Sequence, residues 1–335
     1  MTIATLDSLT ESIRKVNHHK IHTSAGAVNV SVELEDGVPT LTGTVEGSTY
    51  RIGDYAEKSL LRLIGLNRKF VDNASSDTTL IESAINTSLA GASRDRRSAI
   101  HVSCANDNIQ CFSLVKASAD VPPTLSEVWD VVRDTAGEDL SGGELVDLGR
   151  GEFDLRLLTN HTMEPKNRVG DVTNSGVMFH VNGTVQAQPF TNRLVCTNGM
   201  TRAELGDILH YEHGNADSIR DIWSQSLEAA KAFNGDIQKL DEVILPNIHT
   251  YVSQQLQIAG ATASLRGRVN DLIAEKAPNN TLWEALQIVT EIARDYAAER
   301  PRKRNQIEAV AGRIVASQAG DGRCGTCNTR LGEGA

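Results

Sequence analysis

Residues 193–200 read Arg-Leu-Val-Cys-Thr-Asn-Gly-Met, and the character of the chain changes at this octet. Residues 171–190 before it have the pattern of two strands, whereas residues 201–210 after it begin a helical pattern. A tight Asn-Gly pair that follows an apolar strand can present backbone groups and a polar side chain together. The octet therefore predicts a strand-to-helix corner, which is either a binding site or a structural feature.

Strands dominate the chain before the octet, and helices dominate it afterwards. Residues 28–34 alternate apolar and polar side chains, which indicates a half-buried strand, and residues 39–45 are expected to pair with it. Residues 54–70 are expected to form a helix, and residues 141–143 (Ser-Gly-Gly) a loop. This order predicts an α+β fold: a mixed antiparallel sheet with helices in the N-terminal and central part, followed by a helical C-terminal half.

The same order predicts three regions. Residues 1–204 are expected to form an α+β domain with a β-rich centre, and residues 205–318 a helical region that packs on it. A sustained apolar stripe from Ile219 to Ile244 would either pack on neighbouring helices or form an oligomer interface. Residues 319–335, which contain five glycines, are expected to form a flexible tail.

The composition narrows the class of protein. The 335 residues are 40% hydrophobic but only 4% aromatic, which suits a globular protein with an aliphatic core. No stretch approaches the roughly 18 apolar residues of a membrane helix, and the N-terminus has no apolar signal region. We therefore expect a cytoplasmic protein. Five scattered cysteines do not form a disulfide framework, which fits that compartment.

The formal net charge of −10 is concentrated in the middle of the chain. A polyanionic partner would therefore have to meet local basic patches, since the overall field repels it. Two short basic patches lie at breaks between expected elements, where they could contact phosphates or could be ordinary solvated turns. Their cations are Arg94, Arg96 and Arg97 in the first patch, and Arg300, Arg302, Lys303 and Arg304 in the second.

Cys324 and Cys327 have the two-residue spacing that lets two thiolates bind one zinc ion. A structural zinc site needs four ligands, and the sequence holds no second pair of this kind. His210 and His213, three residues apart on an expected helix, could complete the site. The alternatives are a redox-active pair and a glycine-rich tail without either role.

Other candidates for catalysis are weaker. Cys196 could act as a nucleophile if His161 or His180 lay beside it, but a cysteine at the end of an apolar strand is more often a core residue. The sequence contains neither a phosphate-binding loop nor a dinucleotide-binding glycine motif. We therefore expect a protein that is not an enzyme and needs no cofactor.

The octet and residues 170–176 (Gly-Asp-Val-Thr-Asn-Ser-Gly) together resemble a family of uncharacterised phage- and plasmid-encoded proteins. The central region of that family pairs a G-D-x-x-x-x-G segment with an R-L-V-C-x-N-G segment. A second match is Asn-Thr-Leu-Trp-Glu at residues 280–284, followed by Thr290 and Glu291. The resemblance implies a mobile-element origin, with the host cytoplasm as the compartment if the protein is phage-encoded. It also implies an accessory role in phage DNA metabolism, and some related phage proteins bind single-stranded DNA.

We therefore predict a non-catalytic protein that binds single-stranded nucleic acid and forms a homo-oligomer, which would multiply weak contacts. Arg193 and Asn198 would present donors at the strand end, and the two basic patches would contact phosphates. One alternative is an oligomeric structural or interaction protein that acts through the apolar stripe of residues 219–244. The other is an enzyme that depends on zinc or on Cys196.

Overall fold

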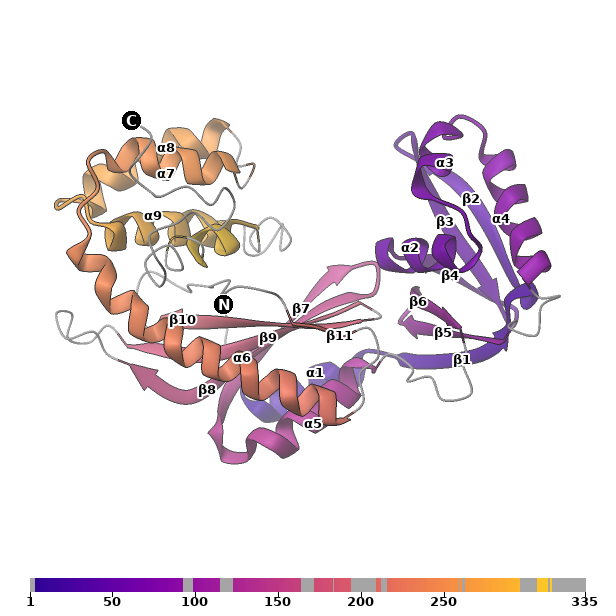
Figure 1. Cartoon of the computed structure of the whole chain (residues 1–335), viewed down its shortest axis with the longest axis horizontal. Coiled ribbons are helices and arrows are strands. Elements are labelled where there is room, and N and C mark those ends of the chain that lie inside the picture. The colour runs from indigo at the N-terminus through magenta and orange to yellow at the C-terminus, as the bar shows by residue number, and fades with distance from the viewer. Residues whose placement is uncertain are drawn as a thin grey trace.

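The structure is a computed structural model, and it confirms the predicted α+β fold. The strands of the described residues form two sheets, and their buried apolar side chains form three large clusters. Each sheet has its own cluster, and the C-terminal helices have the third (Figure 1). The structure describes residues 4–92, 99–114, 123–163, 172–182, 184–193, 209–211, 216–258, 260, 263–295, 306–312 and 314.

Six of the described strands form the N-terminal sheet, in the order β1-β5-β6-β4-β3-β2. Neighbouring strands are antiparallel except β4 and β6, which are parallel, so the sheet is mixed. The strands are β1 (His18–Ser24), β2 (Val28–Glu35), β3 (Val38–Val45), β4 (Ser48–Ile52), β5 (Ala99–Ala105) and β6 (Asn108–Leu114).

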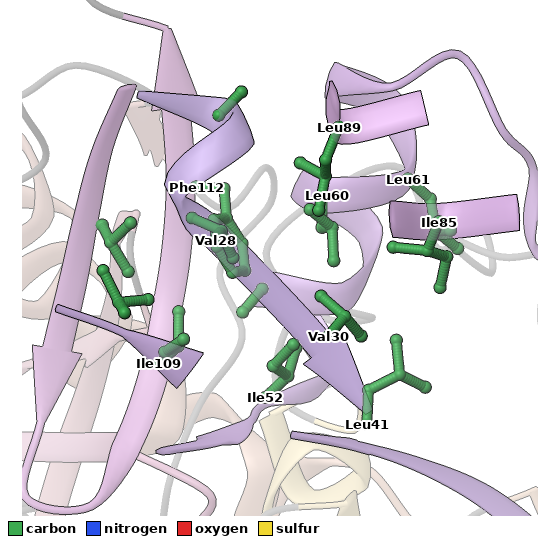
Figure 2. Packing of buried hydrophobic residues seen from close by; sticks show 14 of the residues in the cluster. Val28, Val30, Leu41, Ile52, Leu60, Leu61, Ile85, Leu89, Ile109 and Phe112 are labelled. Carbon is green, nitrogen blue, oxygen red and sulfur yellow. The ribbon is translucent and has the colours of Figure 1, made fainter. Parts of the chain in front are cut away.

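Three helices cover one face of this sheet: α2 (Asp54–Leu63), α3 (Arg68–Asn73) and α4 (Thr78–Ala92) (Figure 1). Alternate strand residues such as Val30 and Leu41 point into the layer between sheet and helices, where they meet Leu60 and Ile85 (Figure 2). This is the half-buried alternation that residues 28–34 predicted, since one face of β2 is buried and the other is not.

Helix α4 closes the free edge of the N-terminal sheet. The Asn86 side chain accepts a hydrogen bond from the Val30 backbone N at 2.8 Å and donates one to the Val30 carbonyl at 2.7 Å. A carboxylate oxygen of Glu82 also accepts from the Val32 backbone N at 3.2 Å. These side chains satisfy backbone groups that an edge strand would otherwise offer to another chain.

Five of the described strands form the central sheet, which is antiparallel throughout, in the order β11-β10-β9-β8-β7. One face of this sheet is apolar and packs against three helices that come from distant parts of the chain (Figure 1). The strands are β7 (Leu140–Gly149), β8 (Glu152–Met163), β9 (Thr173–Val181), β10 (Val185–Arg193) and β11 (Leu209–Tyr211); the helices are α1 (Leu6–Lys15), α5 (Leu125–Ala136) and α6 (Ala216–Ile237).

The C-terminal helices α7 (Ile248–Ile258), α8 (Ala263–Lys276) and α9 (Leu282–Asp295) lie on the opposite side of the central sheet from α1 and α5 (Figure 1). They share a core with apolar residues of the short helical stretch 306–312. The predicted boundary between residues 204 and 205 lies outside the described residues. β11 is a strand within the region expected to be helical, because it adds to the edge of β10.

The turn between β7 and β8 joins the two sheets. Arg150 forms an ion pair with Asp54 at the start of α2, and Gln110 of β6 donates a hydrogen bond to the Gly151 carbonyl. A Cβ at Gly53 would lie 2.6 Å from the Arg150 carbonyl oxygen, so this backbone approach requires glycine. The N-terminal sheet is therefore held directly against the central one.

Gly176 provides a test of packing within the central sheet. A Cβ at this position would lie 2.6 Å from both the Leu157 carbonyl oxygen and the Phe190 ring. We expect Gly176→Ala to lower the free energy of unfolding by about 1–3 kcal/mol, because neighbouring backbone would have to move. Urea unfolding measures this change. Gly91→Ala is the control, because Gly91 is an exposed position of α4 where a Cβ would meet no atom within 4 Å. Equal stability of the two variants would contradict the argument.

Candidate functional site

The start of β9 and the end of β10 lie side by side in the central sheet. Antiparallel pairing of β9 with β10 places Thr173 opposite Arg193, and Asn174 opposite Asn192. Ser175 in turn lies opposite Thr191. The start of β9 and the end of β10 therefore form one end of the central sheet, and Arg193 is the one octet residue that the structure describes there.

This end of the sheet buries several polar side chains. The Thr159 hydroxyl donates to the Ser175 carbonyl at 2.9 Å, and the Asn174 amide donates to the Thr159 carbonyl at 3.1 Å. Within the described part of the chain, Asn174 Oδ1 and Thr191 Oγ1 are buried without a hydrogen-bond partner. Such atoms cost about 1–3 kcal/mol each when they stay unpaired, so this end is a candidate ligand-binding region.

Ser175 and His161 are the only nucleophile and base we find paired within the described residues at this end. Ser175 Oγ lies 3.2 Å from His161 Nδ1. The Ser175 side chain is 0% exposed, however, so no substrate can approach its hydroxyl. The pair lies at the irregular end of β8, where the register shifts between Leu158 and Thr162.

A chain of four polar side chains crosses the other end of the same sheet. The Thr184 hydroxyl donates to Asn182 Oδ1 at 2.9 Å, which leaves Asn182 Nδ2 to donate to His180 Nε2 at 3.0 Å. His180 Nδ1 in turn donates to Asp154 at 2.9 Å. The Glu152 carboxylate also lies 3.9 Å from His180 Nε2, so both ring nitrogens have polar neighbours and the chain links the β9–β10 turn to β8.

Arg156 lies between these two ends and joins the sheet to the C-terminal helices. Its guanidinium is 3.2 Å from the Glu308 carboxylate and 3.6 Å from that of Glu144. The side chains of Arg156 and Glu308 are each only 2% exposed. The helical stretch that carries Glu308 is therefore anchored on the polar face of β8.

The predicted site residues fall mostly outside the described residues. Arg193 is the exception, since its backbone ends β10 opposite Thr173. His210 lies in the strand β11 and is not helical, so the expectation that it shares a helix face with His213 was wrong. Outside the described residues lie Arg94, Arg96, Arg97, Asn198, Arg300, Arg302, Lys303 and Arg304, together with Cys196, Cys324 and Cys327.

The elements that flank the two basic patches belong to different cores. Arg94, Arg96 and Arg97 stand in sequence between α4 and β5, which both belong to the N-terminal sheet and its cluster. The patch from Arg300 to Arg304 stands between α9 and the stretch 306–312, which share the C-terminal cluster. Only the second patch is adjacent to an element that contacts the central sheet through a described ion pair.

The apolar stripe of α6 is used inside the chain. Ile219, Ile222 and Trp223 are each 3% exposed or less, and the Trp223 ring stacks on Phe179 of β9 at 6.3 Å. These residues pack on the central sheet and are not available to a second copy of the chain, so this part of the stripe is not an oligomer interface. Leu240 extends the stripe into the core of the C-terminal helices.

Cys104 and a search for clustered metal ligands bear on the alternative of a cysteine- or zinc-dependent enzyme. Burial raises the pKa of the Cys104 thiol to about 12, so this cysteine is not a thiolate at neutral pH. Among the described residues, no group of three or more His, Cys, Asp or Glu side chains could hold a metal ion. No helix in the described ranges is long and apolar enough to cross a membrane.

Comparison of the chain with protein-family models, with curated proteins and with solved structures found no match.

Sequence reasoning missed the polar face of the central sheet. Residues 152–157 read Glu-Phe-Asp-Leu-Arg-Leu, an alternation that predicts a strand with one polar face. Such a face is normally solvated, but here Glu152, Asp154 and Arg156 are 5% exposed or less. The sequence pattern predicts that the strand has a polar face. That this face is buried follows only from the tertiary packing.

Proposed function

We propose that this chain binds single-stranded nucleic acid without catalysis, as an accessory factor of phage or plasmid DNA metabolism. The observation that carries the proposal is the buried pair of Arg156 and Glu308. This pair attaches the helical stretch 306–312 to the central sheet. That stretch follows the basic patch Arg300–Arg304 in sequence, and strand β10 of the same sheet ends at Arg193.

Chain geometry limits how far these cations can lie from the central sheet. Arg304 precedes Glu308 by four residues, so their Cα atoms are within about 14 Å of each other in any conformation. Arg156 and Gln188 lie in the same cross-strand row, since both are paired with Met178 of β9. Arg193 lies five residues further along β10 from Gln188. Residues 300–304 and the end of β10 can therefore contact one extended strand of nucleic acid.

The acidic body of the protein determines how such binding would behave. With a net charge of −10, long-range attraction of a polyanion is absent, and contacts must come from the local cations. Binding of this kind weakens steeply as salt rises, because each phosphate contact releases condensed counterions. A flexible single strand can follow cations that do not match the regular spacing of a duplex.

Fluorescence anisotropy with a labelled single-stranded oligonucleotide tests the proposal. We expect the triple variant Arg302→Ala, Lys303→Ala and Arg304→Ala to weaken binding and to reduce the salt slope of log K by about 2, at about 0.7 per contact. We assign binding to the second patch and not to the first, because only the second adjoins an element that is paired with the central sheet. The matched control Arg94→Ala, Arg96→Ala and Arg97→Ala should therefore leave affinity unchanged.

Two outcomes would contradict the proposal. Wild-type protein that fails to bind the oligonucleotide even at low salt would end it. Equal loss of affinity in the two triple variants would show that the two patches act together or non-specifically. It would contradict the proposal that binding is confined to the patch next to the central sheet. Homo-oligomerisation stays a prediction, and light scattering of the same samples tests it, since oligomers would multiply weak contacts.

A further inference from the structure

Two histidines form a pair on the N-terminal sheet. His22 of β1 lies opposite His101 of β5 in the antiparallel register. Their ring centroids are 4.8 Å apart, and the rings are inclined to each other by 57°. Since the neighbouring Ile21 and Val102 are buried in the core under the helices, strand alternation turns the two histidines toward the opposite face. His22 is exposed there, and His101 is partly exposed.

The spacing of the rings suits a shared metal ion. Neutral imidazole binds zinc through a ring nitrogen at about 2.0–2.1 Å, and that nitrogen lies about 1 Å from the ring centre. Two imidazoles on one tetrahedral ion therefore have ring centres about 5 Å apart, close to the observed 4.8 Å. A cross-strand pair on a paired sheet also keeps both ligands in place before the ion arrives.

We propose that His22 and His101 form a binding site for a divalent transition-metal ion, with the remaining coordination positions open to water or to an external donor. Imidazole ligands select Zn²⁺, Ni²⁺ or Cu²⁺ over Mg²⁺ and Ca²⁺, which require oxygen ligands. The nearest cation along β1 on this face is Lys20, and Glu127 compensates its charge at 3.0 Å.

Calorimetric titration of the full chain with Zn²⁺ tests the site, in a background of Cys324→Ser and Cys327→Ser that removes competing thiols. We expect one equivalent to bind, and we expect His22→Ala and His101→Ala each to weaken the affinity at least tenfold. His249→Ala is the matched control, because His249 is exposed on α7 and should leave the affinity unchanged. With Cu²⁺, electron paramagnetic resonance should show coupling to two imidazole nitrogens, and to fewer in either single variant.

Unchanged zinc affinity in the double variant His22→Ala and His101→Ala would overturn the proposal. So would the absence of any heat of binding in the parent protein. Loss of fold is separated from loss of ligands by the thermal unfolding temperature: Zn²⁺ should raise it in the parent and in His249→Ala but not in the paired-histidine variants. The result is independent of nucleic-acid binding, which the basic-patch variants test.

Discussion

Arg156→Met should lower the free energy of unfolding by about 3–5 kcal/mol, one of the two largest effects we expect in this protein. The guanidinium of Arg156 is 2% exposed and lies 3.2 Å from the equally buried Glu308. Removing one member of a buried ion pair leaves the other charge in a medium that solvates it poorly. Because Glu308 lies on the helical stretch whose apolar residues belong to the C-terminal core, the variant should also loosen the C-terminal helices from the central sheet.

Urea unfolding of Arg156→Met measures the loss, and Arg51→Met is the matched control. Arg51 forms an ion pair with Glu35 at a similar 3.2 Å, but its side chain is 63% exposed. An exposed pair contributes about 0–1 kcal/mol, so the control should cost little. A loss no greater than that of Arg51→Met would mean that the buried pair does not couple helices to sheet. Pairing Arg156→Met with Glu308→Leu should recover part of the stability, since both charges are then gone.

Local signals in the sequence predicted much of the N-terminal half. Residues 124–127 (Thr-Leu-Ser-Glu) have the sequence form of a capping box, and the structure has one there. The Thr124 hydroxyl accepts from the Glu127 backbone N at 3.2 Å, and the Glu127 carboxylate accepts from the Thr124 backbone N at 2.6 Å. Such a motif needs only four consecutive residues, so tertiary structure does not have to be known.

Two predictions of secondary structure were wrong at glycine residues. The helix expected over residues 54–70 is divided into α2 and α3 around Gly65, whose φ of +72° ends the first helix. The loop expected at residues 141–143 lies within β7. Gly143 exchanges backbone hydrogen bonds with Ala4 at 2.8 and 3.2 Å, and a Cβ there would lie 2.4 Å from the Arg156 carbonyl oxygen. Glycine signals a turn in sequence, but here it permits close approach of strands.

The candidate site was predictable only in part, because its residues come together through strand register and helix packing. The register that places Thr173 opposite Arg193, for example, joins residues 20 positions apart in sequence. The burial of Arg156 depends on Glu308, which is 152 residues away in sequence. No local pattern contains such a contact.

Stability should also fall markedly as the pH drops from about 6.5 to about 4, because of His18 at the junction of β1 and α5. Burial lowers the pKa of His18 from 6.5 to about 4, against opposing contributions from Gln110 and Glu127. His18 Nδ1 accepts a hydrogen bond from the Leu125 backbone N at 2.9 Å, and its ring meets the Phe153 ring edge-on at 5.9 Å. A protonated imidazole could not accept that bond.

The sign follows from which state binds the proton first. Below pH 6.5 the unfolded chain protonates His18 while the folded protein keeps it neutral. Proton binding therefore stabilises the unfolded state relative to the folded state until the pH reaches about 4. A shift of this size corresponds to a loss on the order of 3 kcal/mol, fully expressed below pH 4 and absent above pH 6.5.

Carboxylates also titrate in this range, so the diagnostic quantity is the difference between variants. We expect His18→Gln, whose side-chain oxygen can still accept from Leu125, to remove about 3 kcal/mol of the acid-induced loss measured by urea unfolding across this pH range. His249→Gln makes the same chemical change at an exposed position and should leave the wild-type pH profile unaltered. A His18→Gln profile parallel to that of the wild type would show that His18 is not held neutral, and that its contact with α5 does not contribute to acid sensitivity.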